Sequence, residues 1–374
     1  MNTNWAQVLL ALAVAAPGWG QLPAGNWRTD LSKRSIELSE LRGGGPPKDG
    51  IPAIDHPKFV SPEQAAEWLD AKEPVLVVEY QGEARAYPFQ IMIWHELVND
   101  TIGDLPILVS YCPLCNSAIV FERRVDGETY SFGVSGLLRE SDMVMYDRPT
   151  DSLWQQVTGE AIVGVMTGKR LRVVSSQTVA FGDFARAFPE GKVLSRETGH
   201  RRPYGTNPYV GYEFGEFLFK PKVPKGLKAP KERIVVVESG GEATAYSFGL
   251  LRREGVIEGV TGGLRYVVFH QRGTVTALDR SRIADSRDVG SVGVFVPEVE
   301  GRRLTFQRKG GRIRDRETGS EWNVLGFATK GPLEGKRLKP VRHGVYFAFA
   351  WLIFNPETEL ITKPGQARER ARSR

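Results

Sequence analysis

The chain has 374 residues, of which 41% are hydrophobic and 25% are charged, and its net charge is +6. This length exceeds one ordinary core and predicts two or three domains, and the composition is typical of a folded globular protein. We find no basic face interleaved with aromatic residues and no nucleic-acid-binding motif, so we expect no nucleic-acid partner.

The first apolar segment is Val8–Ala16 (VLLALAVAA), which is followed by Pro17 and Gly18. It is shorter than the roughly 20 residues of a membrane span and is typical of a signal peptide, here over 1–20. We therefore expect an exported protein, periplasmic or secreted, with no membrane span. At the other end, 361–374 is an arginine-rich tail that we expect to be disordered.

One helix is predicted within the N-terminal segment 21–73. Ser61 is a favourable N-cap, Pro62 suits the first turn, and Gln64 occupies the capping-box position. We expect this helix to end near Ala71.

An internal duplication follows. The stretch VLVVEYQGEARAYPF at 75–89 is matched by IVVVESGGEATAYSF at 234–248. Each stretch has β-branched residues, a glycine turn and then alternating residues, which is the pattern of a β-hairpin. The density of matches indicates a duplicated unit rather than coincidence.

The copies extend over about 74–200 and 232–360, separated by a loop and Pro/Lys-rich linker at 201–231. A short apolar segment near the end of each copy, Phe184-Ala185 and Phe349-Ala350, is expected to be helical. We predict a mostly β (α+β) fold: a duplicated, two-lobed arrangement of β-barrel-like or sandwich-like units with a few short helices.

The copies differ where chemistry is expected. In the alignment His95 falls on Glu254, Cys112 on Gln271 and Cys115 on Thr274. Residues shared by both copies are explained by the common fold, whereas residues found in one copy need another reason. We therefore place the site in the first copy and treat the second as degenerate.

Cys112 and Cys115 are the two cysteines of the chain and form one C-x-x-C motif. In an oxidising compartment such a pair is by default a disulfide. Thioredoxin-type exchange needs a helix after the motif to lower the thiol pKa, but 118–123 alternates like a strand. The motif alone is consistent with either a disulfide or a metal site.

His95 begins a sequence, His95-Glu96-Leu97-Val98-Asn99, that is one substitution from the H-E-x-x-H zinc motif. Asn99 replaces the second histidine and is a poor ligand, so a metalloprotease is not expected. A lone histidine is more often structural, yet this one is lost together with both cysteines. Met143 and Met145 alternate on a predicted strand and are either core residues or thioether ligands.

These motifs resemble those of a bacterial family, the domain of unknown function 3179. The matching stretches include Arg85–Pro88, Trp94–Glu96, Tyr111–Ala118, Asp142–Arg148, Ser152–Trp154 and Tyr204–Tyr209. The resemblance covers about 50–215, with the second copy as a fainter echo. It implies that His95, Cys112 and Cys115 form one site with the Tyr204–Tyr209 loop nearby, and it names no reaction.

Our leading hypothesis is an exported metal-binding redox protein with a small-molecule or redox-protein partner. Two thiolates, an imidazole and a thioether form a soft donor set, so copper is favoured over zinc or iron. The expected ligands are His95, Cys112, Cys115 and, more weakly, Met145 or Met143. Residues expected around them or around a substrate are Glu96, Asn99, Tyr111, Asp142, Arg148, Trp154, Tyr204 and Tyr209.

Two alternatives remain at this stage. One is a non-enzymatic binding or scaffold module whose C-x-x-C motif forms a structural disulfide. The other is a thiol–disulfide oxidoreductase, which requires an accessible thiolate of low pKa.

Overall fold

The computed structural model describes residues 26–364. The expected signal peptide at 1–20 and residues 365–374 of the expected basic tail lie outside the described residues. Between 26 and 364, no helix has the length and apolar character needed to cross a membrane.

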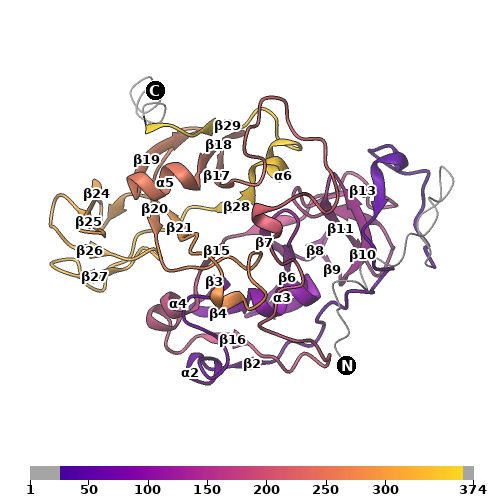
Figure 1. Cartoon of the computed structure of the whole chain (residues 1–374), viewed down its shortest axis with the longest axis horizontal. Helices are drawn as coiled ribbons and strands as arrows, with labels where there is room; N and C mark the ends of the chain where they lie inside the picture. The colour runs from indigo at the N-terminus through magenta and orange to yellow at the C-terminus, as the bar shows by residue number, and fades with distance from the viewer. Residues whose placement is uncertain (1–25, 365–374) are drawn as a thin grey trace.

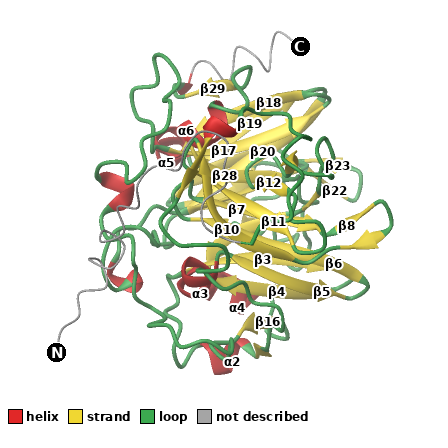
Figure 2. Cartoon of the chain, turned by 90° about the vertical axis from the view of Figure 1, so that its right-hand side faces the viewer, coloured by secondary structure: helices red, strands yellow, loops and turns green. Residues whose placement is uncertain are grey.

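The fold is mostly β with short helices, as predicted, and most of the helices lie along one side of the stacked strands (Figure 2). The chain before the first copy contributes a 3-10 turn at Leu38–Glu40, β1 (Leu41–Gly43), β2 (Phe59–Val60) and α2 (Pro62–Ala65). Elements of the first copy are β3 (Pro74–Tyr80), β4 (Glu83–Pro88), α3 (Phe89–His95), β5 (Leu97–Ile102), β6 (Leu105–Cys112), β7 (Ser117–Glu122), β8 (Arg124–Val125), β9 (Glu128–Thr129), β10 (Phe132–Arg139), β11 (Asp142–Asp147), β12 (Leu153–Gln155), β13 (Glu160–Val163), β14 (Arg172–Val174), β15 (Ser176–Ala180), α4 (Phe181–Ala187) and β16 (Lys192–Leu194).

The second copy repeats this order, except for β14, after a 3-10 turn at Tyr212–Phe214. Its elements are β17 (Arg233–Ser239), β18 (Glu242–Ser247), α5 (Phe248–Glu254), β19 (Val256–Thr261), β20 (Leu264–Gln271), a 3-10 turn at Ile283–Asp285, β21 (Ser291–Phe295), β22 (Glu298–Val299), β23 (Arg302–Arg303), β24 (Phe306–Lys309), β25 (Arg312–Asp315), β26 (Glu321–Trp322), β27 (Ala328–Lys330), β28 (His343–Phe347), α6 (Ala348–Leu352) and β29 (Glu359–Ile361).

The predicted hairpins are confirmed, and their registers agree between the copies. Val75 pairs with Pro88 in the first copy, and Ile234 pairs with Ser247 in the second. Each hairpin gains an antiparallel strand on one side, β15 or β28, and a parallel strand on the other, β16 or β29. The alternation of β-branched and small residues, together with the glycine turn, is enough to specify this local unit.

The helix predicted after Ser61 is present but shorter than expected. Ser61 Oγ accepts from the Gln64 backbone N–H (3.2 Å) and Gln64 Oε1 accepts from the Ser61 N–H (3.0 Å), which is the predicted capping box. The α-helix ends at Ala65 rather than near Ala71, because the next residues close tighter turns such as Trp68 N–H to Ala65 O (3.1 Å).

The two copies pack against each other through β15 and β28, the strands that precede the last helix of each copy. β28 of the second copy lies on β7 of the first, and β15 of the first copy lies on β21 of the second. The β10–β13 and β24–β27 sheets lie at opposite ends of the molecule (Figure 1). The described strands form several open sheets and no closed barrel, so the sandwich-like alternative of the prediction describes them better.

Each copy also contains the same aspartate–tryptophan corner. Trp154 Nε1 donates to Asp147 Oδ2 and Trp322 Nε1 donates to Asp315 Oδ2, both at 2.9 Å. A threonine three residues after each aspartate, Thr150 or Thr318, donates to it as well. This repeated set shows that Trp154, which we expected near the site, belongs to the common scaffold.

We predict that Trp154→Phe and Trp322→Phe each lower the free energy of unfolding by about 1–3 kcal/mol, since each leaves a buried carboxylate oxygen without its indole donor. Urea denaturation monitored by circular dichroism measures this loss. Trp94→Phe is the control, because its indole donates to Thr206 O in a more exposed place (3.2 Å), and a smaller effect is expected. A large loss in one copy alone would show that the two corners are not equivalent.

Candidate metal centre

The C-x-x-C motif forms the turn between β6 and β7. Cys112 ends β6, and the chain reverses through Cys115 N–H to Cys112 O and Asn116 N–H to Pro113 O, both at 3.2 Å. Asn116 adopts a positive φ of 48°, which asparagine tolerates better than most residues. Both thiols are thereby held at the end of a buried hairpin.

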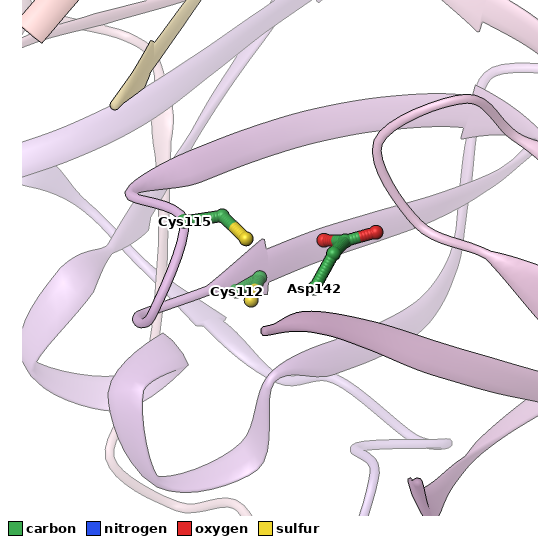
Figure 3. Close-up of side chains that lie close together, drawn as sticks. All are labelled: Cys112, Cys115 and Asp142. Atoms are coloured by element: carbon green, nitrogen blue, oxygen red, sulfur yellow. The ribbon is translucent and has the colours of Figure 1, made fainter. Parts of the chain in front are cut away.

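Asp142 reaches the same place from the β10–β11 turn. Glu140 and Ser141 both have positive φ, and this tight reversal starts β11 at Asp142. Figure 3 shows the Asp142 carboxylate beside the two cysteine side chains. One ligand atom from each of the three residues lies within 4.8 Å of the others, and all three residues are at most 1% exposed.

The hydrogen bonds around this group leave one acceptor free. Asp142 Oδ2 accepts from Gln155 Nε2 and from the Val157 N–H (3.0 Å), whereas Asp142 Oδ1 is buried and receives no N–H or O–H. The neighbouring Cys115 thiol, a weak donor, lowers the pKa of this carboxyl group and so offsets part of the effect of burial. Cys115 Sγ donates to Ser141 O at 3.4 Å. A buried carboxylate oxygen without an N–H or O–H donor is costly, so this atom calls for an additional group at the site.

The electrostatics of the metal-free site disfavour charge. Burial raises the pKa of Cys112, and burial together with the neighbouring Cys112 raises the pKa of Cys115 well above its usual value. Burial also raises the pKa of Asp142 to about 6. At neutral pH the two sulfurs are therefore protonated, and they are not reactive thiolates.

The chain after the motif is a strand rather than a helix. β7 starts at Ser117 and pairs with β6 along its whole length. The N-terminal end of a helix, which lowers the thiol pKa in thioredoxin-like proteins, is therefore replaced by a hairpin.

His95 lies in a different place from the thiols. Its Nδ1 is bonded to Pro52 O and its Nε2 to Tyr204 Oη, both at 2.7 Å. Burial lowers the pKa of His95 to about 4, so the ring is neutral. The arrangement brings Cys112 and Cys115 together with Asp142, and it does not bring His95 into that group. With both ring nitrogens engaged, His95 has no free lone pair to offer an ion in this conformation.

Asn99 does not share a helix face with His95. Helix α3 ends at His95 and Asn99 lies on β5, where its side chain bonds the backbone of Phe132 through both polar atoms (2.8 Å each). The helical spacing of the sequence motif is therefore wrong for this chain, because Glu96 takes a positive φ of 58° and stops the helix.

Three other predicted residues have contacts that a structural role explains. Arg148 is paired with Asp55 at 2.7 Å. Met143 and Met145 lie on β11 as expected and belong to the apolar cluster that contains both cysteines. Packing in this cluster accounts for both methionine side chains.

Glu96 lies next to the candidate centre and occupies an unfavourable backbone position. The equivalent residue of the second copy is Gly255, with a φ of 75°, and each carbonyl accepts a bond from its β6 or β20 strand. Glycine suits this conformation, whereas glutamate costs about 1–2 kcal/mol. Burial raises the pKa of Glu96 to about 8, with Tyr209 donating a hydrogen bond to its carboxylate. The first copy thus keeps a buried acid where the backbone favours glycine.

The loop at 201–231 contacts the centre through residues that follow the Tyr204–Tyr209 stretch. Tyr212 Oη donates to Leu114 O inside the C-x-x-C turn (3.0 Å), and Ser141 Oγ donates to Phe219 O. The Tyr111 hydroxyl is buried without a partner. Its pKa is raised by burial, and the charges that affect it include those of Cys112 and Glu96.

Sequence reasoning placed Asp142 near the site but not among the ligands, and it missed Gln155, Ser141 and Tyr212. One signal was available for Asp142: if the aspartate–tryptophan corners are superposed, its position falls on Gly310 in the second copy. The partners of Asp142 depend on the pairing of β10, β11 and β12, which the sequence does not reveal.

Comparison with known families gives one match. The family described as "Protein of unknown function (DUF3179)" matches residues 48–358. The chain belongs to this family. Its match runs through both copies, so the second copy is part of what defines a DUF3179 protein. No curated protein and no solved structure matches the chain.

We predict that Glu96→Gly is more stable than Glu96→Ala by about 1–2 kcal/mol, because both remove the carboxylate and only glycine adopts a positive φ freely. Chemical denaturation of the two variants measures the difference. Equal stabilities would contradict the strained backbone at this position in the DUF3179 chain.

Glu96 also predicts a pH dependence. Because its pKa is about 8 in the folded chain and near 4.5 when unfolded, the folded state holds a proton that the unfolded state lacks between these values. Its contribution to stability is present below pH 4.5 and is lost as the pH rises through 8. The melting temperature of the metal-free protein should therefore fall more steeply between pH 5 and 8 for the wild type than for Glu96→Gln. Equal slopes of melting temperature against pH would contradict the buried acid.

Proposed function

We propose that this DUF3179 protein binds a transition-metal ion through Cys112, Cys115 and Asp142. The observation that carries the proposal is the convergence of two thiols and an unpartnered carboxylate oxygen in a fully buried place. An ion would give Asp142 Oδ1 a stronger partner than the neighbouring Cys115 thiol, and it would compensate the cost of burying three ionisable groups.

Metal binding accounts for more of these contacts than a structural disulfide or thiol–disulfide exchange does. A structural disulfide accounts for the two sulfurs but gives no role to the carboxylate beside them. Thiol–disulfide exchange needs an accessible sulfur of low pKa, whereas Cys112 and Cys115 are 1% and 0% exposed and their pKa values are raised.

The donor set favours zinc over copper. Our sequence-based preference for copper depended on an imidazole and a thioether, but the His95 imidazole lies outside the group and a carboxylate converges with the two thiols. Zinc accepts cysteine sulfur and carboxylate oxygen together, whereas Cu(I) prefers soft ligands alone. Three protein donors leave a fourth position for water or a substrate atom, which is the pattern of sites with a chemical role.

Export is part of the proposal and is supported by the apolar run at Val8–Ala16. In an oxidising compartment two neighbouring thiols form a disulfide unless they are protected. Coordination of both sulfurs by one ion supplies that protection.

Metal content tests the proposal. Protein purified without chelator is expected to contain one ion per chain, and Asp142→Asn and Cys112→Ser are each expected to lose at least about 90% of it, as removal of one of three ligands implies. Asp147→Asn is the matched control, because Asp147 lies on the same strand and is also buried but bonds Trp154. It is expected to lower stability and to keep the ion.

Elemental analysis of the four proteins measures both the amount and the identity of the metal. Copper in place of zinc would correct the identity of the metal and leave the proposed ligands unchanged. A wild-type protein without metal, in which thiol titration finds a disulfide, would overturn the proposal in favour of the scaffold hypothesis.

Metal affinity is also expected to rise steeply with pH. Because both thiols are protonated in the metal-free protein, binding releases about two protons per ion above the pKa of Asp142, which is about 6. Competition with a chromophoric chelator between pH 6.5 and 8 measures this dependence. An affinity that does not change with pH would exclude coordination by both sulfurs.

A further inference from the structure

Exposed apolar side chains are concentrated in one segment of the chain. Among residues 26–364, five large hydrophobic side chains are exposed, and four of them lie in the loop between the copies: Val210, Phe214, Leu218 and Val223. Their exposed fractions are 60%, 49%, 56% and 38%. Single exposed apolar residues are common on protein surfaces, whereas several in one segment indicate a surface that contacts another molecule.

The fold holds this loop in a defined conformation. Lys231 Nζ donates to three backbone carbonyls within 212–216, at 2.6, 2.9 and 3.0 Å. The Arg233 guanidinium donates to both carboxylate oxygens of Glu213 (2.6 and 2.8 Å), and this pair is buried. The exposure of the apolar side chains is therefore a fixed property of the surface.

Neighbouring residues of the loop show which side chains the core uses. The Phe217 ring packs edge-on against Phe349 of α6, with ring centroids 4.9 Å apart, and Phe219 also packs against the main apolar cluster. Leu218 lies between them and is exposed. Phe217 and Phe219 therefore attach the loop to the core, and Leu218 is left for a contact outside the chain.

Lysines accompany the exposed apolar side chains. Residues 217–231 contain five lysines and no acidic residue. Three of them, Lys220, Lys225 and Lys228, are exposed and form no ion pair with an acidic side chain of the described residues. Lys222 is paired with one carboxylate at 3.3 Å, but its side chain is still 79% exposed. The loop thus presents cations beside apolar groups.

This combination restricts the partner. A second copy of the chain would present the same lysines, so a symmetric contact between two such loops would bring like charges together. The partner must instead offer anions directly beside an apolar layer that excludes water. The surface of an anionic phospholipid bilayer has this arrangement, with phosphate headgroups above the acyl chains.

We propose that residues 210–228 dock the protein on the surface of an anionic phospholipid bilayer. The exposed apolar side chains enter the boundary between headgroups and acyl chains, and the lysines meet the lipid phosphates. Binding of this kind is peripheral and reversible, and it requires no segment that crosses the bilayer. The proposal does not depend on the metal centre, because none of the proposed ligands lies in this segment.

Co-sedimentation of the full protein with lipid vesicles tests the proposal. Vesicles that contain phosphatidylglycerol are expected to bind the protein at least about tenfold more tightly than vesicles of phosphatidylcholine alone, because several lysines meet the anionic surface. Added sodium chloride is expected to weaken binding to the anionic vesicles, since salt screens exposed charges.

Two double variants separate the apolar from the charged contribution. Leu218→Ser with Val223→Ser is expected to weaken binding by about tenfold, because two apolar side chains no longer leave water. Lys220→Glu with Lys225→Glu is expected to weaken it by at least about tenfold. All four residues are exposed, and circular dichroism checks that each variant keeps the fold.

Matched controls lie outside the segment. Val165→Ser changes the fifth exposed hydrophobic residue, which is 50% exposed. Lys309→Glu with Lys330→Glu reverses two exposed lysines on β24 and β27. Both controls are expected to keep the affinity of the wild type for the anionic vesicles.

Three outcomes would overturn the proposal. The first is a wild-type protein that binds neither kind of vesicle, or binds both equally. The second is full affinity in the Leu218/Val223 variant, which would reduce the contact to adsorption by charge alone. The third is loss of binding in the Lys309/Lys330 control with the loop variants unaffected, which would place the contact on the other end of the molecule.

The same variants identify a different occupant. If vesicles do not bind but poly-glutamate does, and Lys220→Glu with Lys225→Glu abolishes this, the segment docks an acidic protein instead. A dimer in sedimentation velocity that Leu218→Ser with Val223→Ser dissociates would assign the segment to a second copy. Either result would overturn docking on a bilayer, and neither depends on the metal content of the protein.

Discussion

The packing of β15 and α4 of the first copy, and of β28 and α6 of the second, against the other copy is the constraint on which the molecule depends. Phe347 at the end of β28 donates its backbone N–H to Cys115 O (2.8 Å), so the second copy directly holds the C-x-x-C turn of the first. Phe347 and Phe349 also belong to the apolar cluster that contains both cysteines. The candidate metal centre is therefore buried by a segment that lies more than two hundred residues further along the chain.

This packing of one copy on the other has opposite effects at two equivalent places, the C-x-x-C turn that begins at Cys112 and the position of Gln271 in the second copy. Helices α4 and α6 start from matching backbone bonds, Phe181 N–H to Glu73 O and Ala348 N–H to Glu232 O, both at 2.9 Å. In this superposition the Asp183 position of α4 falls on Ala350 of α6. An apolar helix closes the first place and excludes water, which favours coordination of an ion by thiolates. A polar helix leaves the second place open as a cleft of about 520 Å³.

Burial explains the unusual chemistry of the first copy. Cys112, Cys115, Asp142 and Glu96 all lie in surroundings that penalise charge, and each has a raised pKa. Such a cluster lowers stability unless something compensates it, and a bound cation is the compensation that its donor atoms fit. Glu96 adds a backbone cost at a position where the second copy has glycine, which argues that its carboxyl group is retained for the site rather than for the fold.

Short-range sequence patterns are enough to specify the local units and the outline of the site. The hairpins, the Ser61 capping box, the strand after the C-x-x-C motif and the duplication follow from short-range patterns, since turn and strand preferences act between near neighbours. Only the tertiary structure decided which polar groups meet. The motif spacing made His95 a candidate ligand, but the helix stops at Glu96 and His95 bonds Pro52 and Tyr204 instead. The β10–β11 turn brought Asp142 to the thiols in its place. Long-range strand pairing sets these contacts, and the pairing depends on the packing of both copies, which no local pattern records.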